Sequence, residues 1–182
     1  MGPMFGSVSS FHNDRPLLYR ERGANLYNIG SFYLSQLVVQ LPLFMFFPIL
    51  FGSMVYYLVG LNENVERFFM FIFILVVVSV ASSSMGSLFA VVSPSFGVAM
   101  AIIPLITTVL MLFGGFYKNV SNIPPYAIWI YWISIYHFGF EALIHNEMIG
   151  TNFECTSTFC AFPTGESVIE MLEMNGALQH LD

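Results

Sequence analysis

The sequence predicts an all-α integral membrane protein with three transmembrane helices and a further helical segment outside them. Hydrophobic residues make up 57% of the 182 residues and charged residues only 9%, whereas a soluble domain has roughly a quarter of its residues charged. So few charges cannot keep so much apolar surface in water. The three long apolar stretches of the chain are therefore expected to lie in lipid.

Each of these stretches is long enough to cross a bilayer, which takes about 20 mostly apolar residues. They cover residues 32–61, 68–92 and 96–117. The polar joints between them, residues 62–67 (NENVER) and 93–95 (SPS), are so short that neighbouring spans must form antiparallel hairpins. We therefore assign residues 31–117 to the membrane.

The predicted spans contain polar residues and prolines that lipid cannot accommodate alone. Gln36 and Gln40 lie one helical turn apart, and Pro42 and Pro48 predict kinks in the same helix. The second span has a face of small residues at four-residue spacing, made of Ser79, Ser83 and Ser87. Small residues let helix backbones approach closely, and we expect this face to pack within the chain rather than against substrate or another subunit.

The two ends of the chain have a different character. Residues 1–30 combine an apolar opening, MGPMFGSV, which we interpret as the end of a preceding span, with a polar loop. Residues 118–182 include an aromatic-rich stretch, residues 127–144, that is short for a span and rich in Trp and Tyr. These residues favour the membrane interface, so we predict a re-entrant or interfacial helix rather than a fourth span. The capping-box spacing of Ser167 and Glu170 predicts a short helix through Met174.

The distribution of charge predicts the orientation. Lys and Arg concentrate in cytoplasmic loops, and Arg15, Arg20 and Arg22 all precede the first span. We therefore place the N-terminal segment in the cytoplasm and residues 118–182 outside the cell, with the plasma membrane as the expected location. Because the outside is oxidising, a disulfide between Cys155 and Cys160 becomes possible, with two free cysteines as the alternative.

Several activities are excluded or disfavoured. A net charge of −6 leaves no basic surface for nucleic acid. The chain has neither the G-x-x-x-x-G-K-[ST] loop that binds ATP nor a G-x-S-x-G nucleophile motif, so we predict that it is not itself an enzyme and holds no cofactor. His137, Glu141 and His145 share one helix face; we favour a polar stripe facing water over a metal site.

Residues 11–22 (FHNDRPLLYRER), residues 27–33 (YNIGSFY) and residues 40–42 (QLP) resemble the loop that leads into the third span of subfamily G (white/brown-type) ABC transporters. Further matches follow in the family's order: residues 57–61 (YLVGL), 114–116 (GGF), 122–124 (NIP), 145–147 (HNE) and 164–166 (TGE). The resemblance covers residues 11–166. Asn28 departs from it, because that position is usually basic in the family.

The resemblance implies part of a six-helix ABC-2 type transmembrane domain, with spans three, four and five in this chain. It also implies an extracellular re-entrant loop closed by a Cys155–Cys160 disulfide. The implied function is the permease part of an ATP-driven half-transporter that exports lipids, sterols or other amphipathic compounds. Its partners would be membrane lipid, a nucleotide-binding domain of the same parent protein, which would hold ATP and Mg, and a second half-transporter in a homo- or heterodimer. A non-transporting membrane module or a degenerate transporter fragment is the alternative.

Two sets of residues are candidates for the transport machinery. Glu21 and Arg22 lie in the charged run before the first span, where the family has a coupling helix that touches the ATPase domain; a face that binds lipid headgroups is the alternative. Substrate would pass along the third span, lined by Thr107, Met111 and Leu112 and closed by Phe116 and Tyr117. Packing against lipid or neighbouring helices is the alternative for these residues.

Overall fold

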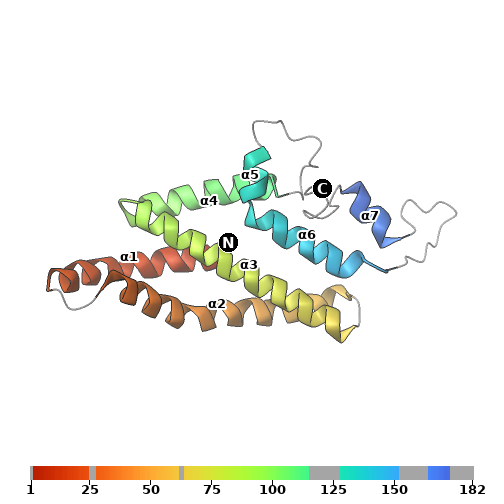
Figure 1. The fold of residues 1–182 in the computed structure, drawn as a ribbon, viewed down its shortest axis with the longest axis horizontal. Coiled ribbons are helices and arrows are strands. Elements are labelled where there is room, and N and C mark those ends of the chain that lie inside the picture. The colour runs from red at the N-terminus through yellow and green to blue at the C-terminus, as the bar shows by residue number, and fades with distance from the viewer. Residues whose placement is uncertain (1, 25–27, 62–63, 115–127, 152–163, 173–182) are drawn as a thin grey trace. The chain divides into compact units, whose positions relative to one another are not determined.

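The computed structural model describes residues 2–24, 28–61, 64–114, 128–151 and 164–172, and these residues are predominantly helical (Figure 1). The helices are α1 (Gly2–Gly23), α2 (Ile29–Val59), α3 (Val65–Val92), α4 (Phe96–Leu112), α5 (Ile128–Ile133), α6 (Ile135–Met148) and α7 (Gly165–Met171). The chain divides into two compact units. One contains Met1–Gly52 and Leu75–Thr107, and the other contains Ser53–Ile74 and Thr108–Asp182.

The predicted spans correspond to α2, α3 and α4. Both α2 and α3, with 31 and 28 residues, are long and apolar enough to cross a membrane. Only 11% of the most apolar window of α2 is buried inside the protein, so this helix is not the core helix of a soluble domain. The third predicted span corresponds to α4, which is apolar over 17 residues. The rest of its predicted length, to residue 117, lies largely outside the described residues.

The first helix joins the two parts predicted for residues 1–30. We expected the end of a preceding span followed by a loop with a coupling helix, and α1 runs from Gly2 to Gly23 as one helix that includes Pro16. Its apolar first half packs in a buried cluster in which Met4 and Val8 contact α3 and α4. The polar second half is helical because it continues a helix that this packing already stabilises.

The small-residue face of α3 packs within the chain, as predicted. A Cβ atom added to Gly86 would lie 2.6 Å from the backbone oxygen of Met4, so α1 approaches α3 more closely than any side chain at Gly86 would allow. Ser79, Ser82 and Ser83 of the same helix are also buried. Small residues therefore bring helices together here where lipid would not require it.

A proline and a serine explain how α2 and α3 are joined. Pro48 has no N–H, so the carbonyl of Phe44, four residues earlier, loses its partner within the helix. The hydroxyl of Ser79 on α3 donates a hydrogen bond to this carbonyl oxygen at 2.9 Å, and both residues are buried. In a membrane each unsatisfied backbone group costs several kcal/mol, so Ser79 allows α2 to continue through Pro48.

The segment after α4 forms more, and shorter, helices than predicted. The expected single helix over residues 127–144 is broken between α5 and α6 at Ser134, whose side chain caps α6. The predicted short helix is present as α7, but it begins at Gly165, so Ser167 lies in its first turn and its hydroxyl donates to the oxygen of Thr164. Gly165 is buried against α6; a Cβ atom there would lie 1.9 Å from the Met148 oxygen.

Replacing Ser79 with alanine should destabilise the helix pair, because the Phe44 carbonyl would be left without a partner. We expect a loss of roughly 0.5–1.7 kcal/mol, the range for hydrogen bonds between membrane helices, measured by reversible unfolding in mixed micelles. Ser84→Ala is the matched control, since the Ser84 hydroxyl is exposed and bonds Val80 of its own helix. Pro48→Ala restores the missing N–H, so in a Pro48→Ala background Ser79→Ala should lower the free energy of unfolding much less. An equal loss in both backgrounds would contradict the pairing of Ser79 with the Phe44 carbonyl.

Candidate functional site

The polar second half of α1 is bound to α2 through side chains. Ser10 and Asp14 lie one turn apart on α1, opposite Gln36 and Gln40 on α2. Gln40 donates to the Ser10 hydroxyl at 2.8 Å, and Gln36 donates both to that hydroxyl at 3.3 Å and to the Asp14 carboxylate. The two glutamines thus share one helix face, as their spacing predicted, and they fix the position of α1 along α2.

Arg15 binds α1 to the joint between α3 and α4. Its guanidinium donates to the carbonyl oxygens of Ser93 at 3.2 Å and Pro94 at 3.3 Å. These oxygens come directly after the end of α3, where helix carbonyls lack partners and carry a partial negative charge. Because Arg15 and the glutamine-binding residues lie on the same helix, α1 is held to α2 and to the α3–α4 joint at once.

The predicted coupling residues lie in the last turn of this bound helix. Glu21 is half-buried, and the backbone of Arg22 is helical; the side chain of Arg22 is outside the description. The Glu21 carbonyl accepts a bond from the amide of Ala24, which closes the end of α1. This turn continues the helix that Ser10, Asp14 and Arg15 bind to α2 and to the α3–α4 joint.

The predicted path residues divide into two groups. The Thr107 side chain is fully buried, and its hydroxyl donates to the carbonyl of Ile103 at 2.9 Å and that of Pro104 at 3.0 Å. Met111 and Leu112 are 39% and 47% exposed and can contact lipid, substrate or another helix. Phe116 and Tyr117 lie outside the described residues, as do Cys155 and Cys160.

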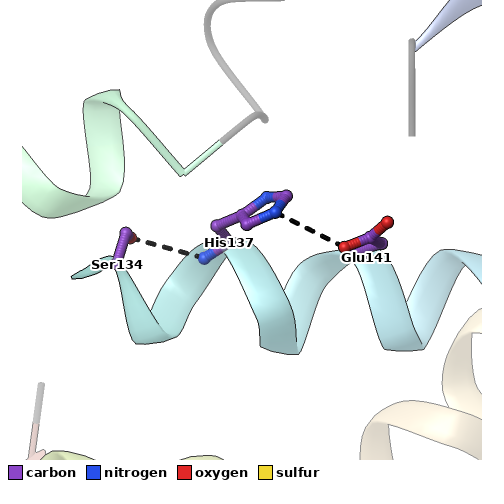
Figure 2. A network of polar contacts seen from close by, with 3 residues as sticks. All are labelled: Ser134, His137 and Glu141. Carbon is purple, nitrogen blue, oxygen red and sulfur yellow. Dashed lines mark hydrogen bonds and ion pairs between the residues drawn. The ribbon is translucent and has the colours of Figure 1, made fainter. Parts of the chain in front are cut away.

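A buried polar network organises the start of α6 (Figure 2). The Ser134 hydroxyl donates at 2.8 Å to the carbonyl oxygen of Leu110, which lies in the last turn of α4. The same hydroxyl accepts from the backbone amide of His137 at 3.4 Å. One turn further on, the His137 Nε2 lies 3.4 Å from the Glu141 carboxylate. The network links α4 to α6 and continues along one face of α6.

The predicted water-facing stripe on α6 was wrong for its first two members. His137 is 1% exposed and Glu141 is 8% exposed, and the ring of Tyr131 lies 3.9 Å from that of His137, centre to centre. The short helix α5 brings Tyr131 over this face, which its position in sequence did not predict. Among the described residues no group of three His, Cys, Asp or Glu side chains could hold a metal ion.

Burial and charge act in opposite directions on this pair. Burial lowers the pKa of His137, and the neighbouring Glu141 carboxylate partly opposes this by favouring the charged imidazole. Burial also raises the pKa of Tyr131 to about 12, with Glu141 as the second cause. A neutral His137 with its proton on Nε2 can donate to the Glu141 carboxylate, and its buried Nδ1 has no hydrogen-bond partner among the described residues.

Comparison with known proteins identifies the family of this chain. Residues 1–148 match the ABC-2 type transporter family, and the chain belongs to that family of membrane transport domains. It is 35% identical over 176 residues to ABC transporter G family member 7 of Arabidopsis thaliana, covering 97% of this chain and 24% of that protein. The chain thus spans about a quarter of the length of this relative.

Two further relatives are similar over most of this chain. It is 28% identical to Protein white of Drosophila melanogaster over 98% of this chain and 27% of that protein. It is 32% identical to the rat broad substrate specificity ATP-binding cassette transporter ABCG2 over 82% of this chain and 23% of that protein. The resemblance seen in the motifs is therefore confirmed.

The low pKa of His137 predicts that the protein becomes less stable in mild acid. Because the folded pKa is below the unfolded value of about 6.5, the unfolded chain binds more protons as pH falls through about 6.5, and stability is lost down to the folded pKa. We expect the melting temperature in detergent to fall between pH 7.5 and pH 5.5, by roughly 2–4 °C per kcal/mol lost. His137→Gln, which keeps a donor, should flatten this dependence, and His145→Gln is the matched control. An unchanged pH dependence in His137→Gln would contradict the assignment.

Proposed function

We propose that this chain is the permease part of an ATP-driven half-transporter that exports lipids, sterols or other amphipathic compounds. The ATP and Mg would be held by a nucleotide-binding domain of the same protein. The observation that carries the proposal is the attachment of α1: a helix with a charged end is bound both to α2, through Gln36 and Gln40, and to the α3–α4 joint, through Arg15. Such a helix can transmit movement from an ATPase domain to the membrane spans.

Contacts within the two units support the proposed orientation. Arg15 contacts Ser93, so the N-terminal segment and the α3–α4 joint lie on one side of the membrane. Arg67, at the start of α3, contacts the end of α6, so the α2–α3 joint and the segment after α4 share a side. Assigning the Arg-rich side to the cytoplasm, as basic residues favour, leaves α6 and a Cys155–Cys160 disulfide outside, at the plasma membrane.

The proposed substrate path follows the exposed end of α4. Met111 and Leu112 supply an adaptable apolar surface, which suits amphipathic substrates of varied shape. Phe116 and Tyr117 would close the path beyond them. Thr107 would border it only after the helices around its buried side chain have moved. We propose that the path lies between two half-transporters in a homo- or heterodimer.

Reversing the charge of Glu21 should uncouple ATP hydrolysis from transport in the full half-transporter. We expect Glu21→Lys to keep its ATPase rate and to lose most of its transport, measured in inside-out vesicles with a fluorescent phosphatidylcholine, a fluorescent sterol and rhodamine 123. Arg20→Glu, at the exposed neighbouring side chain, separates the alternatives. If this helix end only binds anionic headgroups, Arg20→Glu should lower the transport rate and Glu21→Lys should not. No ATP-dependent transport of any probe by the unmodified protein would favour a non-transporting module.

A cysteine at position 111 should report the path directly. In a Cys155→Ser/Cys160→Ser background, Met111→Cys should react with a membrane-impermeant maleimide added from outside, at a rate that changes when ATP is trapped. Ile103→Cys is the control for a buried position of the same helix and should stay unreactive. If position 111 is unreactive in every nucleotide state, Met111 does not line the path.

A further inference from the structure

The start of α3 and the end of α6, about 80 residues apart in sequence, are joined by reciprocal hydrogen bonds. The Arg67 guanidinium donates to the carbonyl oxygens of Glu147 at 3.1 Å and Ile149 at 2.6 Å, and to the Thr151 hydroxyl at 3.3 Å. In return, the Asn146 amide donates to the backbone oxygen of Arg67 at 3.0 Å. We call these four bonds the Arg67 clasp.

The chemistry of a helix end explains the clasp. The last carbonyls of α6 have no partners within the helix and carry a partial negative charge. A planar guanidinium can bind several of them at once, which an ammonium group cannot do with the same geometry. Gly150 turns the chain directly after α6 with a φ of +71°, a conformation that favours glycine.

The clasp differs from an ordinary surface arginine, which contributes little to stability. Arg67, Asn146 and Thr151 are all half-buried, and the return bond from Asn146 fixes the backbone of α3 itself. The neighbouring Glu66 is exposed and takes part in none of these four bonds.

The other end of α6 is also fastened. Ser134, which caps α6, donates its hydroxyl to the carbonyl of Leu110 near the end of α4 at 2.8 Å. Thus α6 runs between the last turn of α4 and the first turn of α3, with side-chain hydrogen bonds to both. Within this unit α6 acts as a brace between two membrane helices.

We propose that Arg67 is a positioning residue for transport. The clasp makes the first turn of α3 and the last turn of α6 move as one body, so that the segment after α4 follows the spans during each cycle. This role rests on the proposed function, because it needs a transport cycle in which the helix ends move. Arg67 acts through α6 and does not contact substrate.

The transport test uses the full half-transporter in vesicles, with whichever of the three probes the unmodified protein moves. Arg67→Gln should lower the maximal transport rate roughly five- to tenfold, the size expected for the net loss of about one ordinary hydrogen bond. The half-saturating probe concentration and the ATPase rate should stay near their original values, which a general loss of folded protein would not produce. Arg67→Lys should recover part of the rate, and Glu66→Gln should leave it unchanged.

A double variant tests whether the four bonds act as a unit. Asn146→Ala should lower the rate in the same way, and Arg67→Gln/Asn146→Ala should be no slower than the slower single variant, because residues in one network are not additive. Additive losses, a changed half-saturating concentration, or an unchanged rate in Arg67→Gln would each overturn the proposal.

A distance measurement keeps the clasp testable even if the protein transports none of the probes. Spin labels at Val65→Cys and Ile149→Cys, two exposed positions beside the clasp, should give a narrow distance distribution that ATP trapping does not shift. Arg67→Gln should broaden it and Glu66→Gln should not. A broad distribution in the otherwise unmodified protein would show that the two helix ends move independently, whatever the outcome of the transport assay.

Discussion

The organisation of this chain depends on one constraint: a backbone carbonyl in lipid must find a hydrogen-bond donor within the protein. The clearest case is the carbonyl of Phe44, which Pro48 deprives of its helical partner and which Ser79 of α3 binds instead. The same hydrogen bond that permits proline in α2 also fixes the neighbouring helix. The proline of one helix and the contact with the next are thus one feature.

The ends of the helices follow the same rule. Arg15 binds carbonyls just beyond the end of α3, and Ser134 binds a carbonyl near the end of α4. Arg67 does the same at the end of α6. Each donor comes from another part of the chain, so satisfying a helix end also joins two segments. A transport domain needs such joints, since movement at one helix must reach the next without unfolding it.

The buried pair on α6 shows a different use of polarity. His137 and Glu141 lie under Tyr131, and burial, which lowers the pKa of His137, keeps the imidazole neutral near pH 7. A neutral imidazole can donate to Glu141 through Nε2 without a second buried charge. The pair therefore fixes one face of the segment after α4 while the apolar exterior of α5 remains available to lipid.

The sequence alone determined the membrane class, the three apolar stretches, the hairpin joints and the family, because these depend on composition, length and local motifs. It also placed Gln36 and Gln40 on one face, since helix periodicity fixes that spacing. Only the tertiary structure decided that α1 is continuous, that His137 and Glu141 are buried, and that Arg67 binds the end of α6. Each of these depends on contacts between separate helices: packing on α3 and α4 stabilises α1, Tyr131 of α5 covers the pair, and a helix end offers carbonyls only once it has folded beside its donor.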